Sequence, residues 1–193
     1  MALLKIAKMG HPVLRRRADP VADPTDAAVH GLIQNMYETM IDANGAGIAA
    51  PQVHVPLRVV MFQITPARAQ QAGEDDEVLP LTILINPEVE PLGDAIVEDW
   101  EGCLSVPGLR GLVPRFDRIR YGGLMPDGER LEREVSGFHA RVVQHECDHL
   151  DGILYPQRMT DLSKLVFESE FRHIVEGAPP VAEEDEIAEA AEA

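Results

Sequence analysis

The fold and the chemistry of this chain centre on the stretch Gln144-His145-Glu146-Cys147-Asp148-His149-Leu150. It contains the pattern HExxH, in which His145 and His149 are four residues apart. On an α-helix, positions i and i+4 share a face, so both imidazoles can reach one metal ion. Glu146 lies beside that face and can activate a metal-bound water. The alternative is structural: two helix histidines that pair with nearby carboxylates.

Helices are predicted in three places by apolar residues at three- and four-residue spacing. One surrounds the HExxH motif, from about 138 to 150, with Ser136 as its cap. A second runs over 25–41, with Thr25 as N-cap. A third runs over 162–175, and the Gly-Ala-Pro-Pro run that follows ends it.

The middle of the chain favours strands. Short segments rich in β-branched and aromatic residues, bounded by Pro, Gly and Asn, lie at 57–62, 81–85, 95–97 and 118–121. Pro126-Asp127-Gly128 predicts a turn and a hairpin around it. Residues 65–80, polar and acidic, are expected to form a surface loop. Helices at both ends and strands between them predict an α+β domain.

Length and composition fit one soluble globular domain. The chain has 193 residues, 45% of them hydrophobic and 26% charged, which excludes collagen-like, coiled-coil and wholly disordered classes. No apolar run is long enough to span a membrane, and lysines interrupt the apolar N-terminal stretch, so no signal peptide is expected. We therefore expect a cytoplasmic protein, in which Cys103 and Cys147 form no structural disulfide.

The formal net charge of −16 is concentrated partly at one end. The last fifteen residues hold six acids and no base, so the remainder carries 27 acids against 17 bases. We expect a catalytic domain over 1–176 and an acidic, flexible tail over 177–193. A chain this acidic is not expected to bind DNA through a broad basic face.

A third metal ligand is needed, because catalytic sites commonly have three protein ligands and one open position. The metzincin pattern fails, since Tyr155 stands where its last histidine would be. Glu168 and Glu170 lie near the distance at which thermolysin-like metallopeptidases place a glutamate. Upstream, Cys103 offers a thiolate. Spacing alone leaves these alternatives open. Cys147 is expected to be a packing thiol, because it points away from the histidine face.

The segment Gly45-Ala46-Gly47-Ile48-Ala49-Ala50-Pro51-Gln52 is a third candidate element. Its glycines and alanines make a slender backbone that a peptide could approach as an added strand. Gln52 offers an amide donor for a developing oxyanion. Taken alone, the segment also suits a tight helix-to-strand connection.

Together with Glu101-Gly102-Cys103-Leu104-Ser105, these segments resemble the three signature motifs of the peptide deformylases, in the same order. Flanking stretches at 84–87 and 140–143 also resemble the family, and the likeness runs from about Leu4 to Phe171. It implies a metal-dependent hydrolase that removes the N-formyl group from the initiator methionine of nascent peptides and releases formate. It also implies one domain with short-stranded mixed or antiparallel sheets around the HExxH helix.

The resemblance assigns roles to individual residues. The metal ligands would be Cys103, His145 and His149, holding one divalent ion, with Fe²⁺ expected and Zn²⁺, Ni²⁺ or Co²⁺ able to replace it. Glu146 would accept a proton from the attacking water and pass it to the leaving amine. The oxyanion would be held by the metal, the Gln52 side chain and the backbone N–H of Leu104.

The substrate would lie along Gly45, Ala46 and Gly47. Its methionine side chain would enter a pocket for which the candidates are Ile48, Trp100, Val142 and the stem of Arg141. The resemblance also implies that an arginine holds Glu101; both Arg110 and Arg115 are close in sequence, and Arg115 is favoured.

Some residues depart from the family pattern. Ala46 replaces a larger Val or Ile, His54 stands where glycine is usual, and Trp100 places a large ring before the second motif. None belongs to the metal set, so they bear on substrate preference. A family member that binds formylated N-termini without hydrolysing them is a further alternative. Transient ribosome contact is the expected partner interaction, whereas tight docking on ribosomal RNA through the C-terminal helix is opposed by its few bases and the acidic tail.

Overall fold

The computed structural model describes residues 2–66, 69 and 78–175. Two sheets with antiparallel pairing make up its strand framework. The larger has the order β1-β2-β3-β6-β7, with bounds Gly47–Ala49, Val59–Ile64, Leu79–Pro91, Arg118–Leu124 and Arg130–Ser136. The smaller has the order β4-β5-β8, with bounds Ile96–Cys103, Val106–Phe116 and Leu165–Phe167.

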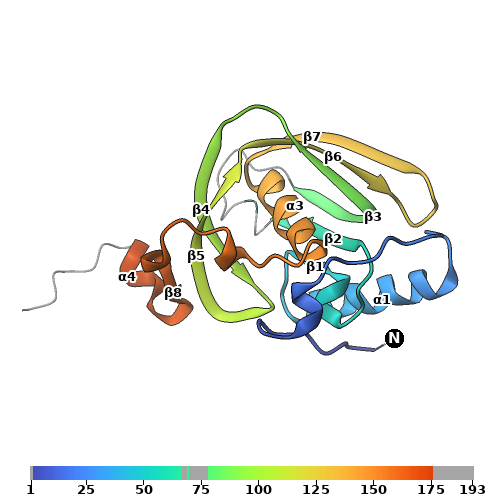
Figure 1. The fold of residues 1–193 in the computed structure, drawn as a ribbon, viewed down its shortest axis with the longest axis horizontal. Helices are drawn as coiled ribbons and strands as arrows, with labels where there is room; N and C mark the ends of the chain where they lie inside the picture. Colours follow the sequence, from blue (N-terminus) through green and yellow to red (C-terminus); the bar gives the residue numbers. More distant parts are fainter. Residues whose placement is uncertain (1, 67–68, 70–77, 176–193) are drawn as a thin grey trace, which may run out of the picture.

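The HExxH helix, α3 (Gly137–Leu150), lies between the two sheets and contacts strands of both (Figure 1). Ala140 and Val143 are fully buried on it and pack in one apolar cluster with Phe62 and Tyr121 of the larger sheet. Ser136 occupies the predicted N-cap position, but its side chain makes no capping hydrogen bond. The predicted helix, its central place and the α+β single-domain class are confirmed.

Helix α1 (Ala27–Asp42) packs its apolar stripe against β1 and the 3-10 helix η2 (Ala50–Val53). The predicted cap was wrong by one residue, because the side chain of Asp26, not Thr25, accepts a hydrogen bond from the Ala28 N–H. Thr25 instead donates its hydroxyl to Asp23. The helix ends before Asn44, which has a positive φ.

The third predicted helix is wrong over most of its length. Residues 162–175 form two 3-10 turns, η4 (Leu162–Lys164) and η5 (Glu168–Glu170), the strand β8 between them and only a short helix, α4 (Phe171–Val175). Strand pairing explains the difference, because β8 hydrogen-bonds to β5 and tertiary pairing overrides a local apolar spacing.

The predicted strands are present, but most are longer, and β5 was missed because proline and glycine interrupt its apolar pattern. The hairpin at 126–128 is confirmed, since β6 and β7 pair on either side of it. Most of the predicted loop at 65–80 and the predicted tail at 177–193 lie outside the described residues. Two short 3-10 helices, η1 (Pro12–Arg15) and η3 (Tyr155–Gln157), complete the described part of the chain. None of its helices is long and apolar enough to cross a membrane.

Candidate active site

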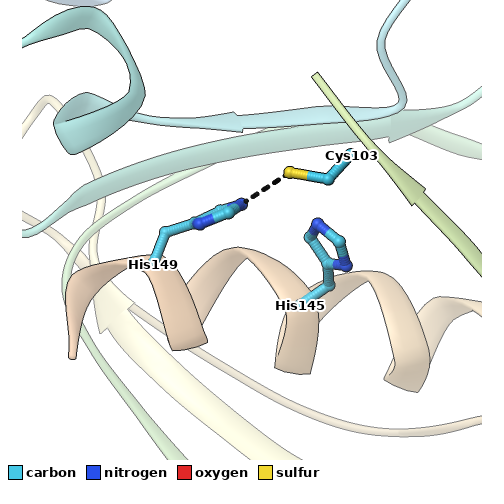
Figure 2. Close-up of side chains that lie close together, drawn as sticks. All are labelled: Cys103, His145 and His149. Carbon is cyan, nitrogen blue, oxygen red and sulfur yellow. Dashed lines mark hydrogen bonds between the residues drawn. The ribbon is translucent and has the colours of Figure 1, made fainter. Parts of the chain in front are cut away.

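Helix α3 presents His145 and His149 on one face, with their ring centroids 5.1 Å apart. Both side chains point toward Cys103 of the smaller sheet (Figure 2). Cys103 is the last residue of β4, where a two-residue turn at Leu104 and Ser105 leads into β5. The turn brings the Cys103 Sγ atom to 3.4 Å from His149 Nε2. Cys103 thus meets two histidines that follow it in the sequence by 42 and 46 positions.

The three side chains fit a divalent metal ion. The ligand atoms of Cys103, His145 and His149 lie within 4.8 Å of one another. A tetrahedral ion bound by one thiolate and one imidazole separates their ligand atoms by about 3.6 Å. The observed Sγ to Nε2 distance of 3.4 Å is close to that value. Within residues 2–66, 69 and 78–175, this is the one such group of three; Glu168 instead pairs with Arg110.

The charge around the two histidines also suits a cation. Burial opposes protonation of His145, but its hydrogen bonds to Cys103 and Glu101 outweigh this and raise its pKa well above the ordinary value. The buried Glu101 carboxylate beside His145 likewise favours a divalent cation. Burial lowers the pKa of His149, so that imidazole is neutral, as a metal ligand must be.

Glu101 orients the imidazole of His145 through a contact with its Nδ1 atom. Its Oε2 atom lies 2.8 Å from His145 Nδ1, which leaves Nε2 for the metal position. Arg115 donates to both oxygens of Glu101, at 2.9 and 3.0 Å. Burial would raise the pKa of Glu101, but its bonds to His145 and Arg115 hold it far below the usual range. The ring of Tyr155 stacks on His145, with centroids 6.3 Å apart.

A buried network of charges extends this support. Arg115, not Arg110, holds Glu101, so the favoured alternative is confirmed. Arg115 also bonds to Asp148, and Asp148 accepts two further bonds from Arg158. Arg141 donates to Glu101 at 2.9 Å and to the carbonyls of Val113 and Val97 at 2.8 and 2.7 Å. The roles of Asp148 and of the Arg141 guanidinium were not foreseen, because only the folded chain brings these partners together.

Glu146 lies beside the metal position, next to β1. Its carboxylate is buried, and within the described structure its Oε2 atom has no hydrogen-bond partner. Burial raises its pKa to about 7. Gly47 is needed here, because a Cβ atom at that position would overlap the Glu146 carboxyl group. A buried carboxyl with an unused oxygen can exchange a proton with a small molecule at the site.

The side-chain amide of Gln52 points toward Cys103 in the candidate metal site. Its Oε1 atom accepts from the Ala49 N–H at 2.8 Å, and its Nε2 atom donates to Ser105 Oγ at 3.1 Å. The same nitrogen lies 3.6 Å from Cys103 Sγ. The side chain is 1% exposed and held at both ends, so its donor is fixed in direction. Sequence reasoning found Gln52 but not Ser105, which orients it.

A cavity of about 890 Å³ opens beside Cys103, His145 and Glu146. Most predicted site residues line it: Gly45, Ala46, Gly47, Gln52, Trp100, Cys103, Leu104, Val142, His145 and Glu146. Ile48 does not, because it is fully buried against α1 on the opposite side of β1 from Gly47. His54 does not line it either; its ring packs edge-on against His11, at 4.7 Å.

Comparisons with known proteins identify the family of this chain. The sequence model of the family described as Polypeptide deformylase matches residues 3–165. Peptide deformylase 1 of Bordetella pertussis is 54% identical over 159 residues, covering 82% of this chain and 89% of the relative. Peptide deformylase 1 of Nitrosomonas europaea is 51% identical over 162 residues, with 82% and 89% covered.

Solved structures that resemble this fold are also peptide deformylases. A class I type b peptide deformylase from Acinetobacter baumannii with bound Met-Ala-Ser has a TM-score of 0.74 at 36% identity, covering 82% of this chain and 99% of that one. The peptide deformylase of Thermotoga maritima has a TM-score of 0.74 at 34% identity, covering 83% and 100%. This chain therefore belongs to the polypeptide deformylase family and has that family's activity, the metal-dependent removal of the N-formyl group from peptides.

Proposed function

We propose that this chain deformylates the initiator methionine of newly made polypeptides at the site built from Cys103, His145 and His149, with Glu146 as its general base. The observation that carries the proposal is the buried Glu146 carboxyl beside a cysteine and two histidines whose ligand atoms lie within 4.8 Å of one another. Such a set can hold a divalent ion and leave one position open.

The metal, when bound, supplies a water of lowered pKa and polarises the formyl carbonyl. Glu146 accepts the proton of the attacking water, and its pKa of about 7 suits that exchange near neutral pH. The same carboxyl group then gives the proton to the nitrogen of the leaving amine. Burial and the fit against Gly47 keep Glu146 in place for both transfers.

The charge that develops on the formyl oxygen is stabilised by two donors of the chain. One is the Gln52 Nε2–H, which Ser105 directs toward Cys103. The other is the backbone N–H of Leu104, in the turn directly after Cys103. Donors that are fixed before the reaction need no reorganisation as the charge appears.

The peptide lies along Gly45, Ala46 and Gly47, at the edge of the larger sheet, because β1 is its outermost strand. An edge strand offers unpaired backbone groups to an added peptide. The methionine side chain packs against Val142, which lines the cavity; Trp100 lines it as well, on the side of Phe171. The Acinetobacter neighbour with bound Met-Ala-Ser, which carries the peptide left after deformylation of formyl-Met-Ala-Ser, supports a peptide in this cavity.

Fe²⁺ is proposed as the resident ion, with Zn²⁺, Ni²⁺ and Co²⁺ as substitutes, because one thiolate and two imidazoles suit all four. The catalytic domain is proposed to span 1–176, with 177–193 as a separate acidic tail, in a cytoplasmic enzyme. Transient ribosome contact is proposed, without tight docking on ribosomal RNA through the C-terminal end, since Lys164, Arg172 and His173 are the only bases over 162–193.

Mass spectrometry of formyl-Met-Ala-Ser after incubation with metal-loaded protein tests the proposal. Loss of the formyl group with all peptide bonds intact is expected. Cleavage within the peptide would favour the metallopeptidase alternative, and bound but unchanged peptide would favour the binding-only alternative. The Glu146→Gln variant is the control, and it is expected to bind the peptide and to release formate far more slowly than the wild type.

A further inference from the structure

The C-terminal segment of the described chain forms part of the wall of the active-site cavity. Strand β8 pairs with β5, with Val166 opposite Arg110 and Phe167 opposite Leu109. This pairing places η5 and α4 beside the smaller sheet (Figure 1). Glu168 and Phe171, from η5 and α4, line the same cavity as Cys103 and Glu146.

An aromatic corner is built where this segment meets β4 and β5. The ring of Phe171 packs edge-to-face on Trp100, with centroids 5.0 Å apart and planes at 80°. The Arg110 guanidinium lies 5.2 Å from the centroid of the Phe171 ring. Arg110 also donates two hydrogen bonds to Glu168, at 2.8 and 3.1 Å. The four side chains therefore hold one another in position.

Two of the four residues of the corner lie outside the range that the family model matches. The family model ends its match at residue 165, so Glu168 and Phe171 lie beyond it. Trp100 and Arg110 lie within the matched range, and the C-terminal segment covers them. The shape of this part of the cavity therefore depends on residues that the family match does not include.

The corner lies toward the outer part of the cavity. Val142, beside the metal position, is 7% exposed, whereas the Arg110 and Glu168 side chains are 37% and 57% exposed. The reacting formyl group must reach the buried end, next to Glu146. The residues that follow the methionine in the peptide therefore extend toward the exposed end.

We propose that Phe171, with Trp100 and Arg110, forms a subsite that selects apolar, and above all aromatic, side chains at the second or third residue of the formylated peptide. The inference rests on the proposed function and specifies its substrate class. Aromatic rings attract one another in edge-to-face and offset arrangements. Glu168 neutralises Arg110, and Asp99 lines the same cavity, so acidic side chains are disfavoured.

Kinetics with four peptides test this subsite. The substrates are formyl-Met amide, formyl-Met-Ala-Ser, formyl-Met-Phe-Ser and formyl-Met-Ala-Phe, and formate release gives kcat and KM for each. The variants are Phe171→Ala, Phe171→Leu and the matched control Phe167→Ala. Phe167 belongs to the same segment and is 64% exposed, but it does not line the cavity.

The wild-type protein is expected to prefer one of the phenylalanine peptides over formyl-Met-Ala-Ser. Phe171→Ala is expected to lower kcat/KM for that peptide about tenfold, through KM, as the loss of an aromatic pair predicts. Phe171→Leu retains part of the preference, while Phe167→Ala and all turnover of formyl-Met amide stay unchanged. An equal loss on every substrate, or no preference in the wild type, would overturn the subsite. No formate release from any peptide by the metal-loaded wild type would instead refute the proposed function itself.

Discussion

The two arginines of β5 provide a matched test of the buried charge network. Arg115 and Arg110 lie on one strand, five residues apart, and each pairs with a glutamate. The Arg115–Glu101 pair is buried, with both side chains 4% exposed, whereas the Arg110–Glu168 pair is open to solvent. We expect the same substitution, arginine to methionine, to have different effects at the two positions.

Arg115→Met removes two hydrogen bonds to Glu101 and one to Asp148. Removing one partner of a buried ion pair typically costs about 3–5 kcal/mol, because a charge is left without compensation. Glu101 keeps Arg141, and Asp148 keeps Arg158, so we expect the lower end, about 3 kcal/mol. Arg110→Met breaks an exposed pair and should cost at most about 1 kcal/mol.

Urea unfolding at neutral pH, with every variant loaded with the same zinc concentration, measures both changes in the free energy of unfolding. Arg115→Lys, which keeps the charge but loses the two-pronged contact, is expected to fall between the wild type and Arg115→Met. Equal losses at the two positions, or a loss below about 1 kcal/mol for Arg115→Met, would refute the reasoning from burial.

Three further predictions follow from contacts of single side chains. Gly47→Ala should lower kcat at least about tenfold, because the new Cβ displaces Glu146, whereas Gly31→Ala, where a Cβ meets open space, should leave formate release unchanged. Cys103→Ser should lose most of its bound metal by elemental analysis, whereas Cys147→Ser should retain it; retention by both would contradict the ligand set. Burial lowers the pKa of His139 to about 4, so the folded state resists its protonation and the chain should lose about 2 kcal/mol of stability from about pH 7.5 to about pH 5. In His139→Gln that part of the pH dependence should disappear. If urea titrations of the variant give the same dependence of the unfolding free energy on pH as the wild type, the assignment to His139 is contradicted.

The HExxH helix could be predicted from sequence because its determinants are local. The i, i+4 spacing of His145 and His149 gives both a shared face whatever surrounds the helix. The third predicted helix failed for the opposite reason. The apolar residues at 165–167 suit a helix locally, but the open edge of β5 offers them strand pairing, and no local signal reports that edge.

Alternation along strands explains two more outcomes. Arg110 and Arg115 are an odd number of residues apart on a regular strand, so they point to opposite faces and cannot both reach Glu101. The sequence does not say which face is inward. By the same rule, Ile48 and Gly47 point to opposite sides of β1, and the close approach of Glu146 takes the side of Gly47. The expectation that Ile48 lines the substrate pocket did not take this alternation into account.

The third ligand could not be chosen from spacing, because Cys103, Glu168 and Glu170 were all compatible with the HExxH helix. Resemblance to a family favoured Cys103, and the fold supplies the physical reason. The tight turn after β4 points the thiol at α3, while Glu168 pairs with Arg110 at the rim of the cavity. The support shell of Glu101, Arg115, Arg141 and Asp148 likewise depends on long-range packing.

The central claim is that Glu146 transfers the proton during deformylation at the Cys103–His145–His149 site. The most direct test is kcat for formate release from formyl-Met-Ala-Ser by protein loaded anaerobically with Fe²⁺, beside Glu146→Gln with equal bound metal. A loss of about 10²–10⁴-fold in the variant, at one metal ion per chain in both proteins, is predicted. Turnover within about tenfold of the wild type at equal metal content would contradict the general-base role of Glu146.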